Sequence, residues 1–193
     1  MQFGAIGVGG RGASIANGAR RLSDLVAVCD LDTQRIDRVN KSLAQGKATG
    51  YQDYRKILDR KDIDFVTIGT TDHWHTRIAI QAMQAGKDVY CEKPLAPTVE
   101  ETQEMVKASS RSNKKTQVGF NYLSNPMFYT AKEIIANGDL GEIISFRGIH
   151  AEDYMSDPRS PYTWRHEPVG GGVLADLGSH ILATAEFLSL IHI

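Results

Sequence analysis

The chain has 193 residues, of which 41% are hydrophobic and 23% are charged. This balance is typical of a globular protein with a buried core and does not indicate disorder. Lys and Arg number 22 and Asp and Glu 23, so the formal net charge of -1 provides no global field that would attract nucleic acid or an anionic membrane. We therefore expect no nucleic-acid partner and no membrane partner.

The length is sufficient for one domain and part of a second. Cys29 and Cys91 each end an apolar run typical of a buried strand, which favours reduced cysteines over a disulfide. Met1 leads directly into a strand pattern without a secretory signal, and the apolar segment 173–193 contains ionisable residues, which makes it a poor membrane span. A cytoplasmic protein is expected.

Short apolar runs alternate with helical patterns over the first 120 residues. Predicted strands cover residues 2–7, 25–29, 65–68, 89–91 and 117–120, and predicted helices cover 11–22 and 74–85, with two more that begin at the caps Asp32 and Thr98. Such alternation predicts an α/β fold, a Rossmann-type doubly wound parallel sheet with helices on both faces. Ligands of these sheets bind at the carboxyl ends of the strands.

The pattern changes after Asn121. A helix is predicted over 127–136, a glycine-rich turn over 138–141, a long strand over 142–151, and a further helix over 175–189 after a polar loop. We therefore predict a domain boundary near Phe120, with domains 1–120 and 121–193.

Glycines follow the first predicted strand in the segment GVGGRG, residues 7–12. Gly7, Gly9 and Gly12 open a helix, so that the backbone can approach a pyrophosphate at the helix N-terminus, with Gly10 and Arg11 in the same turn. Asp30 ends the next strand, where a carboxylate can accept hydrogen bonds from the adenosine ribose. The pattern predicts NAD as the cofactor, while Arg11 and Arg35 keep NADP open.

Two more polar turns follow later strands of the same sheet. Thr70, Asp72 and His75 lie in a turn that we expect to face the nicotinamide half of the cofactor. His73 and His75, separated by one residue and without a third ligand nearby, are a poor metal pattern, and no metal is expected. In the other turn, Lys93 can hydrogen-bond a reacting hydroxyl and the cofactor ribose.

A glycine-rich stretch near the C-terminus leads to Asp176 and His180. Four residues apart on a helix, they share one face, so the carboxylate can orient the imidazole. An imidazole with its usual pKa near 6.5 is suited to exchange the hydroxyl proton. By itself the pair is better explained as two polar residues on a solvated helix surface.

Taken together, these motifs resemble the glucose-fructose oxidoreductase, inositol dehydrogenase and MocA (Gfo/Idh/MocA) family from residue 3 to about 188. The matching pieces are AIGVGGRG, VCDLD, TDHWH, AGKDVYCEKPLA with TVEE, GDLGEI and GGGVLADLGSH. The resemblance implies hydride transfer between a sugar or polyol and NAD(P), with Lys93, Asp176 and His180 as the reaction centre. It also implies that Glu92 and Asn121 contact the cofactor, and that an α+β second domain binds substrate and builds a homo-oligomer.

Residues 119–126, 131–133, 152–158 and 161–165 look most like the branch that acts on pyranosides and anhydrosugars. Candidate substrate contacts are Tyr154, Asp157, Trp164 and Arg165. Ala183 replaces the acidic residue that the family commonly carries three positions after the histidine, and residues 188–193 leave the family pattern. We therefore expect a gene fragment with a truncated second domain, whose last helix exposes apolar surface.

Two other functions remain open. A cofactor-binding sensor would need the glycine turn but not the proton-transfer residues. An NAD-assisted glycosidase would use redox chemistry only transiently, without net oxidation of a sugar.

Overall fold

The computed structural model describes residues 1–153, 155–166 and 171–188, and the side chain of Trp164 also lies outside this description. The chain forms two compact units, Met1–Gly119 and Phe120–Ile193, which we call unit 1 and unit 2 and describe separately.

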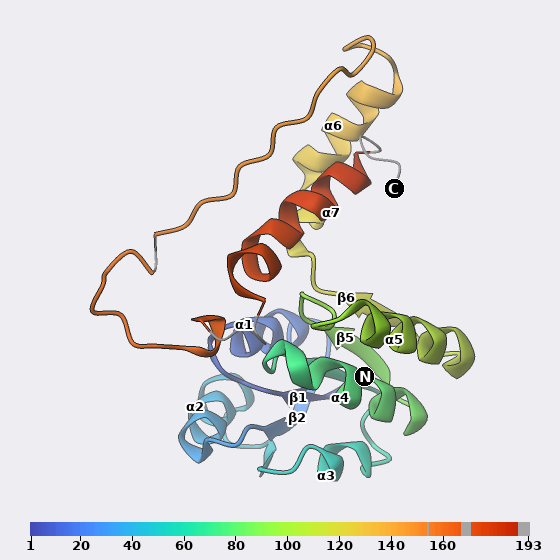
Figure 1. The fold of residues 1–193 in the computed structure, drawn as a ribbon. Helices are drawn as coiled ribbons and strands as arrows, with labels where there is room; N and C mark the ends of the chain where they lie inside the picture. The colour runs from blue at the N-terminus through green and yellow to red at the C-terminus, as the bar shows by residue number, and fades with distance from the viewer. Residues whose placement is uncertain (154, 167–170, 189–193) are drawn as a thin grey trace. The chain divides into compact units, whose positions relative to one another are not determined.

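Unit 1 is built on a six-stranded sheet in the order β3-β2-β1-β4-β5-β6, in which every neighbouring pair is parallel (Figure 1). The strands are β1 (Gln2–Ile6), β2 (Asp24–Cys29), β3 (Thr49–Tyr51), β4 (Phe65–Ile68), β5 (Asp88–Cys91) and β6 (Thr116–Val118). The helices are α1 (Gly10–Ala19), α2 (Thr33–Ala44), α3 (Arg55–Leu58), α4 (His75–Gln84), preceded by a 3-10 turn at Asp72–Trp74, and α5 (Val99–Ser112).

Two of these helices have N-terminal side-chain caps at the residues that the sequence predicts. The Asp32 carboxylate accepts a hydrogen bond from the Gln34 amide at the start of α2, and the Thr98 hydroxyl accepts one from the Glu101 amide at the start of α5. Each bond satisfies a backbone donor that has no partner within the helix. Both predicted caps are confirmed.

Each face of the sheet has its own hydrophobic core. Ala16 of α1 and Ile36 of α2 belong to one cluster of buried residues, and Ile57, Ile78 and Met105 of the other three helices belong to a second. Helices therefore cover both faces of a parallel sheet, which confirms the predicted doubly wound α/β fold.

The sequence prediction missed β3 and α3. The strand has three residues and the helix four, so neither contains a full period of apolar side chains. Pairing with β2 defines the strand, because Ala27, Val28 and Cys29 lie beside Thr49, Gly50 and Tyr51.

Unit 2 contains α6 (Pro126–Ala136) and α7 (Ser179–Phe187), with short helical turns at Asn121–Ser124, Trp164–His166 and Leu174–Gly178. The helix predicted at 127–136 is confirmed. The strand predicted at 142–151 is wrong, because the described residues there form no strand and pair with no other segment. An alternating sequence favours an extended segment, but a β-strand also needs a second strand whose backbone pairs with its amides and carbonyls.

Candidate active site

The carboxyl ends of the strands are in register. Ile6 lies beside Cys29 and Ile68, Ile68 beside Cys91, and Cys91 beside Val118. The predicted site residues that follow these strands in unit 1 therefore lie along one edge of the sheet, as the sequence predicted.

Two glycines of the glycine turn, Gly7 and Gly12, pack too closely against the backbone to carry side chains. Gly7 has a φ of +74°, and a Cβ on Gly12 would lie 1.8 Å from the Gly7 carbonyl oxygen. A Cβ on Gly69, directly after β4, would lie 2.5 Å from the Gly12 Cα. Gly69 was missed, although it follows its strand as Gly7 follows β1. These glycines bring helix α1 against the ends of β1 and β4.

The beginning of α1 is open to a ligand. No side chain caps the helix, a Cβ on Gly10 would meet nothing within 4 Å, and one on Gly9 would touch only Arg35. Uncapped amides at a helix N-terminus bind anions through hydrogen bonds and the helix dipole. This end of α1 therefore fits a pyrophosphate.

Asp30 supports the glycine turn from the end of β2. One carboxylate oxygen accepts a hydrogen bond from the Val8 amide at 2.9 Å, and the other accepts one from the Asp32 amide at 3.1 Å. Arg35 lies 3.8 Å from Asp30 and 3.3 Å from Asp32, and is therefore held by carboxylates. The negative charge of Asp30 beside the turn disfavours a ribose phosphate.

In the turn that follows β4, two buried polar atoms have no hydrogen-bond partner within the described protein. They are the Thr70 hydroxyl oxygen and Oδ2 of Asp72. Asp72 is 2% exposed, and its Oδ1 accepts a hydrogen bond from the His73 amide. An unpartnered buried polar group is costly unless a ligand or water completes it. Together with the open start of α1, these atoms make unit 1 fit a dinucleotide.

His75 is used differently from the prediction. Its side chain is 1% exposed, with Nδ1 2.8 Å from the Pro94 carbonyl oxygen and Nε2 3.1 Å from the Thr70 carbonyl oxygen. Each ring nitrogen therefore faces a backbone carbonyl oxygen of the chain itself.

Glu92 connects the glycine turn with Lys93. Its Oε1 accepts from Arg11 Nε at 2.9 Å, and its Oε2 accepts from the Lys93 amide at 3.0 Å. The carboxylate fits against Gly119, where a Cβ would lie 2.8 Å from Oε1. Lys93 itself is half-buried, and its peptide bond to Pro94 is cis.

In unit 2, Asp176 and His180 are both buried. Asp176 Oδ2 accepts a hydrogen bond from Arg165 Nε at 2.7 Å, so Arg165, predicted to bind substrate, contacts a predicted catalytic residue. The His180 ring lies 4.5 Å from Tyr122 and 5.5 Å from His150, measured between centroids. Tyr122 and His150 were missed, because no local pattern distinguishes them.

The other predicted contacts of unit 2 are exposed or outside the description. Asp157 is exposed and accepts hydrogen bonds from Arg159, and Asn121 begins a 3-10 turn. Tyr154 and the side chain of Trp164 lie outside the described residues.

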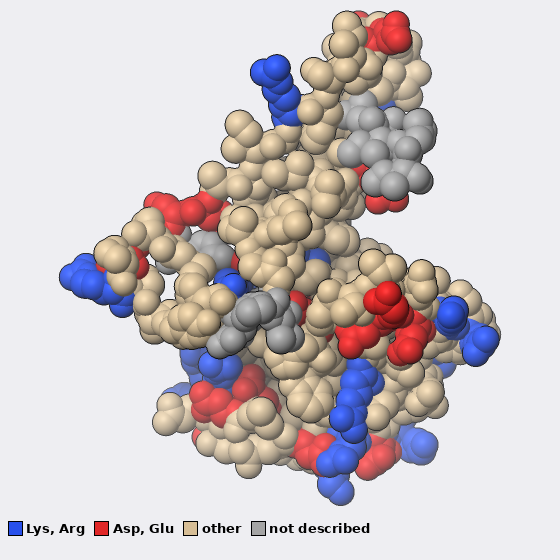
Figure 2. Space-filling view, in the orientation of Figure 1, with Lys and Arg blue, Asp and Glu red and all other residues tan. Residues whose placement is uncertain are grey.

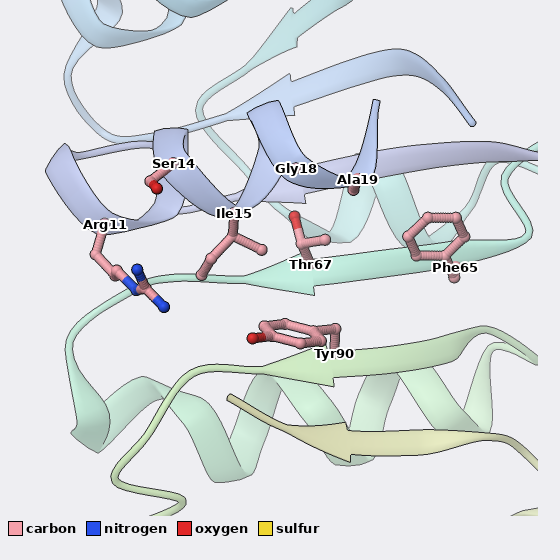
Figure 3. A pocket seen from close by; sticks show the side chains of 8 residues that line it. All are labelled: Arg11, Ser14, Ile15, Gly18, Ala19, Phe65, Thr67 and Tyr90. Atoms are coloured by element: carbon pink, nitrogen blue, oxygen red, sulfur yellow. The ribbon is translucent and has the colours of Figure 1, made fainter. Parts of the chain in front are cut away.

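A cavity of about 300 Å³ opens between α1 and strands β4 and β5 (Figure 3). Its lining comes from Arg11, Ser14, Ile15, Gly18, Ala19, Phe65, Thr67 and Tyr90. Most of these residues lie along the length of α1 and the strands, and of the predicted site residues only Arg11 is among them. The cavity therefore lies mainly on the flank of the sheet.

Burial raises the pKa of the Cys29 thiol to about 12 and that of Cys91 further, so both free cysteines are protonated at neutral pH. Among the described residues, no group of three or more His, Cys, Asp or Glu side chains is arranged to hold a metal ion.

Acidic and basic side chains are interspersed on the face shown in Figure 2. Within the described part of the chain, no helix is both long and apolar enough to cross a membrane.

Comparisons with known proteins agree with this geometry. A family model described as "Oxidoreductase family, NAD-binding Rossmann fold" matches residues 1–120, and one described as "GFO/IDH/MocA C-terminal domain" matches residues 128–190. A levoglucosan dehydrogenase of Pseudarthrobacter phenanthrenivorans is 43% identical over 138 residues, which are 70% of this chain and 35% of that protein. An inositol 2-dehydrogenase of Salmonella typhimurium is 31% identical over 157 residues, 78% of this chain and 46% of that protein.

Solved structures show the same relationship. A levoglucosan dehydrogenase in complex with NADH and levoglucosan superposes with a TM-score of 0.88 at 34% identity, over 97% of this chain and 54% of that one. An NAD-binding oxidoreductase from Klebsiella pneumoniae gives 0.86 at 38% identity, over 97% and 52%. The chain thus spans about a third to a half of the length of these relatives. Its glycine turn, its Lys93 turn and both family matches show that the chain belongs to the Gfo/Idh/MocA oxidoreductase family, with an NAD-binding Rossmann fold in residues 1–120.

Proposed function

We propose that the protein is an NAD-dependent oxidoreductase that transfers a hydride between a hydroxyl-bearing carbon of a sugar or polyol and the nicotinamide. The observation that supports this best is the placement of Lys93. Its turn leaves the sheet at the same edge as the glycine turn, since Ile6, Ile68 and Cys91 are in register. When bound, NAD supplies the ring that accepts or returns the hydride.

Lys93, Asp176 and His180 carry the proton transfer in this proposal. A lysine ammonium at the reacting oxygen stabilises the developing negative charge, and the His180 imidazole takes or returns the hydroxyl proton. Asp176 orients His180, and its hydrogen bond from Arg165 at 2.7 Å supports an ionised carboxylate. Groups of this kind contribute about 10²–10⁴-fold each to the rate of such reactions.

The cofactor contacts follow from unit 1. Gly7, Gly9, Gly10 and Gly12 let the backbone approach the pyrophosphate, and Asp30 accepts hydrogen bonds from the ribose, which favours NAD over NADP. Further contacts come from Arg11, Arg35, Thr70, Asp72, Glu92 and Lys93 of unit 1, and we also assign one to Asn121 of unit 2. Arg11 and Arg35 each pair with carboxylates, which supports the preference for NAD.

The substrate is a pyranose, anhydrosugar or inositol, and two of the relatives are named for levoglucosan, an anhydrosugar, and for inositol. Tyr154, Asp157, Trp164 and Arg165 are the proposed substrate contacts. We further propose that the protein works in the cytoplasm, where its two thiols stay reduced, and as a homo-oligomer.

Replacing Lys93 tests this function. In the purified protein, Lys93→Ala should lower kcat for NAD reduction on a responsive sugar by about 10²–10⁴-fold. The Kd for NAD should stay within about threefold, because the glycine turn is untouched. Lys107→Ala, at an exposed position of α5, is the matched control and should keep wild-type turnover.

Unchanged turnover in Lys93→Ala would contradict the proposal. If the wild type binds NAD but oxidises no pyranose, anhydrosugar or inositol, the protein is better described as a cofactor-binding sensor. Release of an aglycone without net formation of NADH would indicate a glycosidase.

A further inference from the structure

His75 connects the two turns that leave neighbouring strands at the candidate site. It is the first residue of α4, and its side chain is 1% exposed. Nδ1 lies 2.8 Å from the carbonyl oxygen of Pro94, the residue after Lys93, and Nε2 lies 3.1 Å from the carbonyl oxygen of Thr70. The buried ring therefore lies between these two turns, with one nitrogen facing a carbonyl oxygen of each.

The two contacts are not equivalent. A carbonyl oxygen can only accept, so a neutral ring, with one N–H, satisfies one contact, while an imidazolium satisfies both. Burial lowers the pKa of His75, against the effects of the two carbonyls and of Asp72 and Glu92, and so favours the neutral ring at pH 7. The shorter distance, at Pro94, favours the tautomer with the proton on Nδ1.

We propose that His75 is a positioning residue for Lys93. The Nδ1–H group of His75 donates a hydrogen bond to the Pro94 carbonyl and thereby fixes the backbone that carries the lysine. This inference rests on the proposed function, in which the Lys93 ammonium acts at the reacting oxygen. In this role His75 acts on the backbone next to Lys93 and not on the substrate or the cofactor.

Lys93 is then held on both sides. The Glu92 carboxylate accepts from the Lys93 amide at 3.0 Å, and His75 donates to the carbonyl of the next residue. A lysine side chain is long and flexible, so the direction of its ammonium depends on a fixed backbone. A misplacement of about 1 Å at a reacting group can lower the rate by about 10²-fold.

Asparagine and glutamine separate the two contacts. The amide nitrogen of asparagine takes the place of Nδ1, and that of glutamine takes the place of Nε2. His75→Asn therefore keeps the donor to Pro94, whereas His75→Gln directs its donor to Thr70 and leaves the Pro94 carbonyl without one.

We expect His75→Gln to lower kcat by about 10–100-fold, with the KM for the sugar and the Kd for NAD within about threefold. His75→Asn should keep kcat within about fivefold of the wild type. Melting temperatures of both variants control for folding. Equal kcat losses in the two variants, or wild-type kcat in His75→Gln, would overturn the inference.

A measurement on the unmodified protein guards against a variant that does not fold. NMR with ¹⁵N-labelled histidine should show a proton on Nδ1 of His75, and a neutral ring protonated on Nε2 alone would overturn the inference. Running Lys93→Ala in parallel separates the two proposals. An inactive Lys93→Ala beside a fully active His75→Gln refutes only the role of His75, whereas an active Lys93→Ala refutes the proposed function.

Discussion

Unit 1 buries its apolar side chains far more completely than unit 2. Among the described residues, every buried hydrophobic residue except Ala185 and Leu188 belongs to unit 1. In unit 2, Ile144 and Ile149 are 94% and 91% exposed. The two units differ in burial because they differ in strand pairing. Each strand of unit 1 pairs with another strand of the same unit, whereas residues 142–151 pair with no described segment.

Two matched isoleucine-to-alanine substitutions, one in each unit, test this difference in burial. Ile78→Ala removes a side chain that is 2% exposed in the core under α4 and should lower the free energy of unfolding by about 2–5 kcal/mol. Ile149→Ala removes one that is 91% exposed and should change it by no more than about 0.5 kcal/mol. Denaturant unfolding of the purified protein measures both.

Similar losses in the two variants would show that Ile149 is buried in solution. The contrast between the units would then not describe the folded protein.

The glycine turn sharpens the comparison within unit 1. Gly12→Ala places a Cβ 1.8 Å from the Gly7 carbonyl oxygen, which should cost about 1–3 kcal/mol of stability and abolish tight NAD binding. Gly18→Ala lies in the same helix with nothing within 4 Å of the new Cβ, and should stabilise by about 0.5–1 kcal/mol. Thermal unfolding and NAD titration measure the two effects. Unchanged NAD affinity in Gly12→Ala would contradict the close approach of α1 to β1.

A pH series gives the smallest expected effect and tests one buried residue. Burial lowers the pKa of His75, so the unfolded chain, with a histidine pKa near 6.5, binds more protons than the folded one. The contribution of His75 to stability is therefore complete above about pH 6.5 and is lost as the pH falls below it. Melting temperatures should decrease less steeply on acidification in His75→Asn than in the wild type. Parallel curves would show that His75 does not titrate in this way.

Much of unit 1 was predictable because its signals are local. Phe65–Ile68 is a strand with the predicted bounds, and Asp32 and Thr98 begin helices as expected. Apolar periodicity and helix caps depend on residues within a few positions of one another. The short β3 carries no such signal and exists through its pairing with β2.

The candidate site divides in the same way. The sequence by itself determined the α/β fold, the glycine turn, Asp30 and the position of Lys93 after a strand, because strand ends and glycine spacing follow from nearby residues. Only the tertiary structure decided that Glu92 joins Arg11 to the Lys93 amide, that His75 holds the Pro94 carbonyl, and that Arg165 pairs with Asp176. These contacts join residues that are not neighbours in the chain, and which partner a buried polar group takes depends on what the folded chain brings within hydrogen-bond distance.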